Sequence, residues 1–464
     1  MDRNEFITQN MEHMIADLGQ LVSISSVLDS DSASPGQPFG RDVALALERF
    51  LALADQMGME TVNYDGFAGE VTLGHGAYMV GILCHIDVVA AGQGWDTPPF
   101  QLTRKDGCLY GRGSSDDKGP LISSLYAMNY IQSNHLLPDN CSIRLIVGAD
   151  EEEELRCIDY YVKHAARLPD VSFVPDGYFP LVNCEKGLID FDLRFPLHKL
   201  QGAQANITAL SGGTGRNLTP DHAHCHLDVA PEMRPQVFQR LSDIPQLSVH
   251  PTEDGFTVET HGVAVHAMQP EKGHSAINEL LHGLKQSGVS FAQQALLDAY
   301  EQTIGTDLNG QRLGCDFQDE RSGILTLNVG MIQLDGDTAL LKVNTRYPAS
   351  FSYEQIRSTL IAGLEQAGFV YEECLSLPPL DIPRNAPLVQ KLMESYREVT
   401  GDWDHDAFSI GGATYARSIP NAVSFGPLFP DETELAHEAN ECLSIQSFAR
   451  MTEIYISALE KLLN

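Results

Sequence analysis

The sequence predicts an α/β fold in which both ends of the chain build one domain and a second, α+β domain is inserted between them. Two changes along the chain predict this organisation. Up to about residue 187, and again after Pro378, short apolar runs alternate with helix-like segments, as in an open sheet covered by helices. Between these points apolar and polar residues alternate, which is typical of antiparallel strands with one covered face. We therefore expect one domain of residues 1–187 and 379–464, with residues 188–378 inserted.

Two sequence patterns define the elements of the predicted α/β domain. Phe6, Met11, Met14 and Leu18 recur at helical spacing and predict an amphipathic first helix. Runs such as Tyr78-Met-Val-Gly-Ile-Leu are apolar without alternation, as expected of strands buried on both faces. We expect helices over residues 1–20, 43–57, 388–399 and 444–463 and between residues 116 and 134, and strands over residues 70–73, 78–83, 143–147, 171–174 and 422–425.

The predicted insert has a different pattern. Ile189-Asp-Phe-Asp-Leu, Phe256-Thr-Val-Glu-Thr and Leu325-Thr-Leu-Asn-Val each alternate between apolar and polar residues. They predict strands of an antiparallel sheet that is solvated on one face. Helical segments near residues 235–241 and 275–300 would cover the other face.

Composition restricts the class of partner. The 464 residues are 43% hydrophobic, which is enough for large cores, and 30 Lys and Arg against 63 Asp and Glu give a net charge of −33. Such a polyanion repels nucleic acid and acidic lipid, so we expect neither as a partner. No apolar run approaches the ~20 residues of a membrane span, and acidic residues interrupt the first helix, unlike a signal peptide. The nine cysteines lack C-x-x-C pairs, and Cys84, Cys141 and Cys184 lie in or beside apolar runs, which favours reduced thiols in a cytoplasmic protein.

Histidines and carboxylates follow several of the predicted strands. His85 and Asp87 come after the strand at 78–83, and Asp176 comes after the strand at 171–174. The acidic run that begins at Asp150 follows a third strand in the same way, His437 lies one loop beyond a fourth, and Asp116 opens a helix. Because the carboxyl ends of strands in an open α/β sheet form the binding crevice, we expect these groups to converge.

A cluster of acids needs a compensating charge, because neighbouring carboxylates repel one another. Two Zn²⁺ ions would balance Asp116, Glu152, Asp176 and a bridging hydroxide, with His85 and His437 as neutral ligands. Taken singly, each feature has a plainer interpretation: Asp116 as a helix N-cap, the acidic run as a solvated helix start, and His437 as a surface histidine. The coincidence of all of them at strand ends and helix starts favours the metal site.

The segments around these residues resemble the co-catalytic di-zinc peptidase family, which includes aminoacylase, carnosinase, succinyl-diaminopimelate desuccinylase and the peptidase V-type dipeptidases. The likeness to the peptidase V-type branch is the greatest, because of the long insert and the segment Gly411-Gly412-Ala-Thr414-Tyr415-Ala416-Arg417. The resemblance covers essentially the whole chain and implies a mixed-sheet catalytic domain with an inserted α+β lid domain. The segments that carry it are His85-Ile-Asp87-Val-Val, Gly111-Arg-Gly-Ser-Ser-Asp116-Asp117-Lys-Gly, Asp150-Glu151-Glu152, Pro175-Asp176-Gly177 and Ala436-His437-Glu438-Ala-Asn-Glu441.

The resemblance implies a role for each of these residues. One Zn²⁺ would be held by His85 and Asp176 and the other by Glu152 and His437, with Asp116 bridging both and Mn²⁺ or Co²⁺ as substitutes. Asp87 would hydrogen-bond the second ring nitrogen of His85 and fix its tautomer. The family also has a cis peptide bond at the position of Asp116 and Asp117.

The same resemblance implies catalytic and substrate-binding residues. Glu151 would be the general base, and His266 of the lid would stabilise the oxyanion. Arg346 would bind a free carboxylate, and Asn217 matches another substrate-facing lid position. Thr414 and neighbouring backbone amides such as that of Gly412 would assist.

The implied reaction is amide hydrolysis by a metal-bridged water, with a short peptide that has free ends as the substrate. The alternative within the same chemistry is removal of an acyl group from N-acyl amino acids. A zinc-binding or scaffold protein without activity is a third interpretation, which an intact Glu151 argues against. The long insert favours a monomer over a homodimer, because peptidase V-type chains use the extra lid portion in place of a partner.

Overall fold

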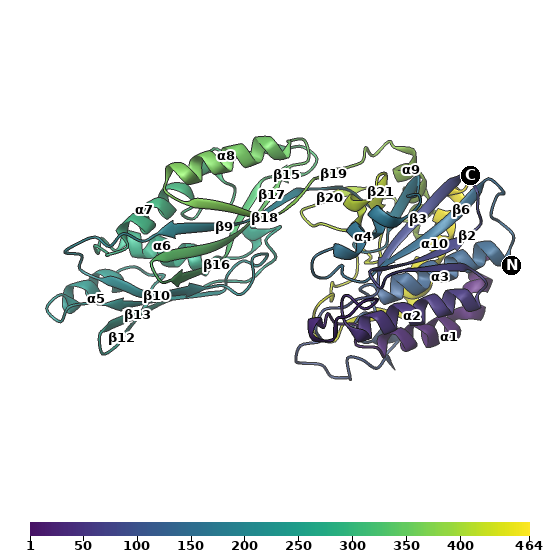
Figure 1. Ribbon diagram of the computed structural model, residues 1–464, viewed down its shortest axis with the longest axis horizontal. Helices are drawn as coiled ribbons and strands as arrows, with labels where there is room; N and C mark the ends of the chain where they lie inside the picture. The colour runs from purple at the N-terminus through teal and green to yellow at the C-terminus, as the bar shows by residue number, and fades with distance from the viewer. The chain divides into compact units, whose positions relative to one another are not determined.

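The computed structural model describes residues 1–464 and is of the mixed α/β class that the sequence predicts (Figure 1). The chain divides into two compact units. The terminal unit comprises Met1–Asn183, Asp381–Phe408 and Ala413–Asn464, and the inserted unit comprises Cys184–Leu380 and Ser409–Gly412. No helix is both long and apolar enough to cross a bilayer.

A mixed sheet of nine strands forms the centre of the terminal unit. Four neighbouring strands, β6, β3, β7 and β21, are parallel, so their carboxyl ends lie along one edge. The antiparallel β2 and β1 extend one side of this group. In spatial order the strands are β1 (Glu60–Tyr64), β2 (Ala68–Leu73), β6 (Cys141–Gly148), β3 (Tyr78–His85), β7 (Val171–Val174), β21 (Ala422–Ser424), β8 (Val182–Glu185) and β19 (Leu380–Asp381), with β20 (Phe408–Ile410) beside β8.

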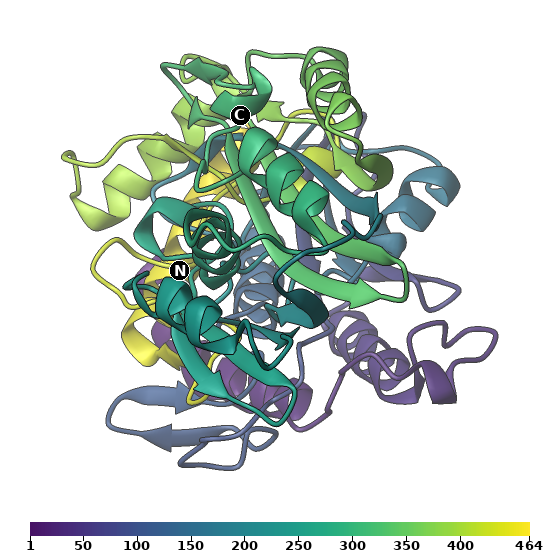
Figure 2. The same ribbon diagram turned by 90° about the vertical axis from the view of Figure 1, so that its left-hand side faces the viewer.

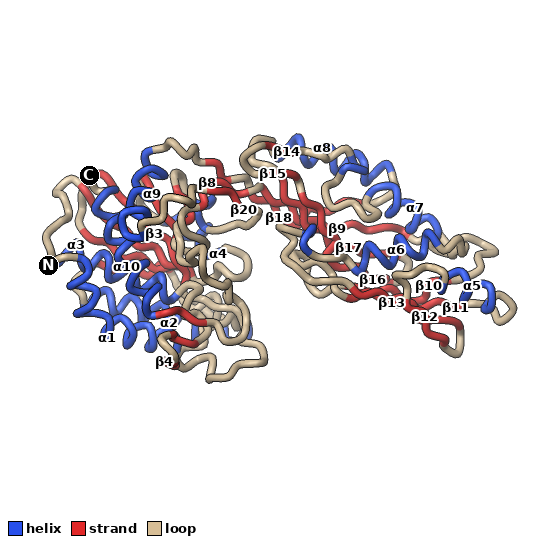
Figure 3. Tube along the Cα trace, turned by 180° about the vertical axis from the view of Figure 1, so that it is seen from behind, coloured by secondary structure: helices blue, strands red, loops and turns tan.

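Helices cover both faces of this sheet. Leu47 and Leu51 of α2 approach Gly69 of β2 on one face, and Tyr161 of α4 donates a hydrogen bond to Glu70 on the other. Helices α1, α3, α9 and α10 pack together, as the tube view shows (Figure 3). The helices are α1 (Arg3–Val22), α2 (Arg41–Gln56), α3 (Lys118–Ser133), α4 (Arg156–His164), α9 (Pro387–Thr400) and α10 (Ile445–Leu462), and a small sheet joins β22 (Cys442–Ser444), β5 (Cys108–Tyr110) and β4 (Thr103–Lys105).

The inserted unit is an antiparallel sheet with helices on one face, shown in teal and green in Figure 2. Ile189, Phe191 and Leu193 alternate along β9 and contribute to its core with residues of α6, α7 and α8. In spatial order the strands are β12 (Ser248–Pro251), β13 (Gly255–His261), β11 (His222–Asp228), β10 (Asn206–Gly212), β16 (Thr326–Asp335), β17 (Thr338–Tyr347), β9 (Gly187–Pro196) and β18 (Val370–Leu377); the helices are α5 (Arg234–Ser242), α6 (Ala276–Gln286), α7 (Gln294–Thr303) and α8 (Tyr353–Gln366), and β14 (Gln318–Asp319) pairs with β15 (Gly323–Ile324).

One predicted element differs from the structure. The helical segment expected at residues 275–300 is two helices, because α6 ends at Gln286 and Gly288 adopts a left-handed conformation with φ of 67°. The following residues run beside the start of β10, where Ala205 bridges Phe291. Helical periodicity continues on both sides of this break and predicts one helix, although the dipeptide Ser287-Gly288 is a turn signal that could have located the break.

Candidate functional site

The predicted metal ligands of the terminal unit lie at one edge of its sheet. His85 is the last residue of β3, Glu152 follows β6 and Asp176 follows β7, so the three neighbouring parallel strands deliver them to the same edge. Asp116 lies just before α3, and His437 lies in the loop between β21 and β22. The peptide bond between Asp116 and Asp117 is cis, as the resemblance implies.

Asp116 lies between the two histidines. Its Oδ1 is 3.0 Å from Nε2 of His85, and its Oδ2 is 3.1 Å from Nε2 of His437. The same nitrogen of His437 is 2.9 Å from Oε2 of Glu152. His85 is fully buried, whereas the His437 side chain is 54% exposed, so the group is accessible from the side of His437.

These contacts define two groups of potential metal ligands that share His85. One contains Asp116 and Glu152, and the other contains Glu151 and Asp176; within each group, one ligand atom per residue lies within 4.8 Å of the others. Glu151, which was not predicted to be a ligand, therefore lies within 4.8 Å of His85 and Asp176.

The packing of carboxylates shifts their acidity. Burial, followed by the charge of Asp176, raises the pKa of Glu151 well above its ordinary value. Burial and the charge of Asp116 raise the pKa of Asp176 to about 7. Hydrogen bonds to Asp116 and Glu152 raise the pKa of His437 to about 11. Burial and neighbouring carboxylates thus disfavour the ionised forms of Glu151 and Asp176 where no counter-charge is present.

The structure changes the detail predicted for Asp87. Nδ1 of His85 lies 3.0 Å from the backbone carbonyl oxygen of Asp87, whereas the nearest carboxylate oxygen is 3.6 Å away. That carboxylate instead accepts a hydrogen bond of 3.0 Å from the backbone N–H of Glu152. The tautomer of His85 is therefore set by the backbone of Asp87, while its side chain positions the acidic turn after β6.

A buried ion pair that the sequence analysis did not single out holds two ligand-bearing loops together. Arg112 and Glu441 are 2.7 Å apart, with side chains 2% and 0% exposed. Glu441 also accepts hydrogen bonds from the backbone N–H groups of Gly113, Ser115 and Asp116. Arg112 donates to the carbonyl oxygen of His437 at 3.0 Å. Both residues stand inside the motifs quoted above, but nothing in those motifs shows that they pair.

Four predicted substrate residues lie in the inserted unit. Leu218, next to Asn217, forms an isolated antiparallel β-bridge with His266. The carbonyl of Asn217 accepts a hydrogen bond from the backbone N–H of Ala267. Arg346 is buried in β17, where it donates to Oδ1 of Asn344 and to the carbonyl of Gly411, the neighbour of Gly412. Thr414 belongs to the terminal unit and caps a short helix at Tyr415–Ser418.

His266 has a defined proton arrangement. The backbone N–H of Met268 donates to its Nδ1 at 3.2 Å. Nδ1 is therefore an acceptor, and the neutral ring carries its proton on Nε2. A hydrogen-bond donor at Nε2 is the arrangement that stabilisation of an oxyanion requires.

Comparison with known proteins extends these observations. Residues 81–461 match the model of peptidase family M20/M25/M40. The chain is 35% identical to "Putative dipeptidase YtjP" of Bacillus subtilis over 462 residues, covering 98% of both chains, and 33% identical to "Putative dipeptidase SAUSA300_1697" of Staphylococcus aureus over 467 residues, covering 99% and 98%.

Solved structures share the fold at low identity. Human carnosine dipeptidase 1 is similar with a TM-score of 0.59 and 15% identity, covering 99% of this chain and 98% of that one. The dipeptidase Dug1p of Saccharomyces cerevisiae has a TM-score of 0.61 at the same identity and the same coverage. The match over most of the sequence establishes that the chain belongs to peptidase family M20/M25/M40.

Proposed function

We propose that the protein is a dipeptidase that uses two Zn²⁺ ions to hydrolyse the peptide bond of short peptides with free ends. The observation that carries the proposal is the convergence of His85, Asp116, Glu152 and His437, with ligand-type contacts of 2.9–3.1 Å between neighbours. Sequence similarity over nearly the full length of relatives named as putative dipeptidases supports the choice of substrate.

The ligand set fits two divalent cations. Imidazole nitrogen and carboxylate oxygen are the ligands of catalytic zinc, and the half-buried carboxylates with raised pKa values gain the counter-charge that they need. His85 and Asp176 would hold one ion, Glu152 and His437 the other, and Asp116 both. When bound, such ions polarise a carbonyl group and lower the pKa of water to about 7.

Glu151 then serves as the proton carrier. Its raised pKa favours acceptance of a proton from the attacking water, which the carboxyl group then gives to the departing amine. His266 donates from Nε2 to the oxygen on which negative charge develops. The ion pair of Arg112 and Glu441 keeps Asp116 and His437 in place during turnover, because Glu441 binds the backbone N–H of Asp116 and Arg112 binds the carbonyl oxygen of His437.

The two ends of the substrate are recognised by opposite charges. The guanidinium of Arg346, held by Asn344 and Gly411, binds the terminal carboxylate, with Asn217, Gly412 and Thr414 assisting. Acidic groups beside the metal ligands bind the free amine. Recognition of both ends selects substrates by length and favours dipeptides. The nine cysteines form no disulfide bond, which supports a cytoplasmic location, and we expect a monomer.

Blocking the substrate amine is expected to lower kcat/KM about 10–100-fold, because one charge-assisted hydrogen bond contributes ~1.5–3 kcal/mol. The measurement compares a panel of zinc-loaded reactions on dipeptides and on their N-acetylated forms, with chelator-treated protein as the control. Equal or faster hydrolysis of the blocked forms would instead identify a deacylase. Failure to cleave any member of either series would refute enzymatic amide hydrolysis.

A further inference from the structure

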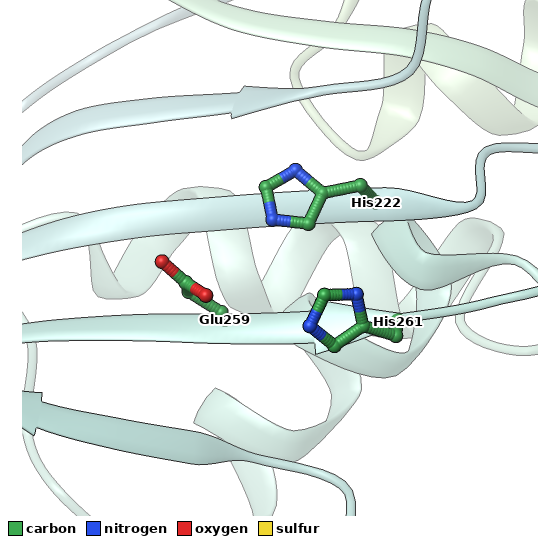
Figure 4. A group of neighbouring side chains, drawn as sticks. All are labelled: His222, Glu259 and His261. Atoms are coloured by element: carbon green, nitrogen blue, oxygen red, sulfur yellow. The ribbon is translucent and has the colours of Figure 1, made fainter.

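Two histidines and a glutamate gather on the face of the inserted sheet that its helices leave uncovered. His222 of β11 and His261 of β13 are direct cross-strand partners, and Glu259 precedes His261 by two residues and thus shares its face. The intervening residues Ala223 and Val258 point the other way, into the core. Figure 4 shows the three side chains on the same side of the two strands.

The geometry of the three side chains suits a metal ion. One ligand atom from each lies within 4.8 Å of the other two, and the two imidazole rings are 5.2 Å apart between centroids. Ligand atoms around a tetrahedral zinc at about 2.1 Å stand roughly 3.4 Å apart. Small rotations of exposed side chains on two paired strands are enough to close the remaining distance.

The strand register brings the three side chains together, and no hydrogen bond or ion pair between side chains occupies their ligand atoms. Neither histidine is hydrogen-bonded or ion-paired to another side chain, although the ligand atoms of the two rings and of Glu259 lie within 4.8 Å of one another. Other histidines of the unit do have such partners: His226 bonds to Thr257 at 2.9 Å, and His282 pairs with Glu301 at 2.8 Å.

We propose that His222, Glu259 and His261 form a further metal site on the inserted unit, which binds a divalent transition metal with the preferences of Zn²⁺. Two imidazoles and one carboxylate suit zinc, nickel or copper, whereas Mg²⁺ and Ca²⁺ prefer sites of oxygen alone. His224, directly opposite Glu259 and with its ring 5.5 Å from that of His222, is placed to supply a fourth ligand. Because its ligands come from two strands, the ion joins β11 to β13 and stabilises their pairing.

The test counts bound zinc in the full-length chain. Wild type and the double variant His222→Ala/His261→Ala are saturated with Zn²⁺, freed of excess by gel filtration and analysed for metal content. We expect the double variant to hold one zinc per chain fewer than wild type. The matched control is His250→Ala, an exposed histidine on the neighbouring strand β12, which should retain the wild-type content. Because the comparison is a difference, it stands whatever number of ions the cluster around Asp116 holds.

A second measurement isolates the site. In an Asp116→Asn background, we expect competition with a chromophoric chelator to detect one zinc whose affinity falls at least ten-fold on His261→Ala. The melting temperature without zinc should be the same in all variants, and added zinc should raise it only where both histidines are present. Equal zinc content in wild type and the double variant, or an affinity that His261→Ala leaves unchanged, would overturn the proposal. Should alanine impair folding, His222→Asn/His261→Asn serves in its place.

Discussion

Replacing Glu151 by alanine is expected to lower kcat for dipeptide hydrolysis by about 10²–10⁴-fold while leaving the metal content of the protein unchanged. The residue is half-buried, and desolvation and the charge of Asp176 raise the pKa of its carboxyl group, so it can hold and release a proton within the reaction. Alanine removes that proton carrier but leaves His85, Asp116 and Glu152 in contact. Steady-state kinetics together with elemental analysis of the purified variant check both parts of the expectation.

The acidic run itself provides the control for this experiment. Glu153 is two residues further along and exposed, so Glu153→Ala removes a carboxyl group from the same acidic run but leaves Glu151 in place. We expect its kcat to remain close to that of wild type. A wild-type rate in Glu151→Ala would defeat the assignment of the general base, and a joint loss of metal and activity would assign Glu151 a ligand role instead.

Replacing Glu441 by alanine is expected to lower the free energy of unfolding by about 3–5 kcal/mol, the cost of leaving one partner of a buried ion pair alone. Arg112 would keep its charge in a site where its side chain is 2% exposed, and the N–H groups of Gly113, Ser115 and Asp116 would lose their acceptor. Urea denaturation after treatment with chelator measures the loss without a contribution from bound metal. Zinc affinity should fall as well, because Asp116 and the loop of His437 lose their shared anchor.

Two further variants separate the charge of Glu441 from its position. Glu438→Ala removes an exposed carboxylate from the same loop and should leave the unfolding free energy nearly unchanged. The double variant Arg112→Met/Glu441→Leu should recover much of the lost stability, since apolar replacement of a whole buried pair is often neutral. It should not recover the zinc affinity. An unchanged stability in Glu441→Ala would show that the pair does not hold the two loops.

Much of the terminal unit could be predicted because its strands are buried on both faces. The apolar run Val171–Val174 is read directly as β7, and helix and strand ends elsewhere fall within a few residues of those expected. The polar residues after such runs are conspicuous for the same reason, and His85, Glu152 and Asp176 could be named from them. Exposed elements such as α8 lack so strong a contrast and were not predicted.

Other features depend on contacts between distant residues and have no signal in local pattern. The pairing of Arg112 with Glu441 spans 329 positions. His85 contacts the backbone carbonyl of Asp87 and not its carboxylate. This depends on the position of the turn after β6, where the N–H of Glu152 donates to that carboxylate. The meeting of His222 with His261 follows from the register between β11 and β13, which sequence alone does not fix.

By itself the sequence determined the fold class, the family and the identity of the acid- and histidine-bearing segments, since burial periodicity and short motifs are local properties of the chain. Only the tertiary structure decided which of these side chains touch, which carboxylates have raised pKa values, and that an ion pair ties the loops of Asp116 and His437 together. Those properties depend on separations of a few ångströms between residues that are tens to hundreds of positions apart, and only the packed sheet sets such separations.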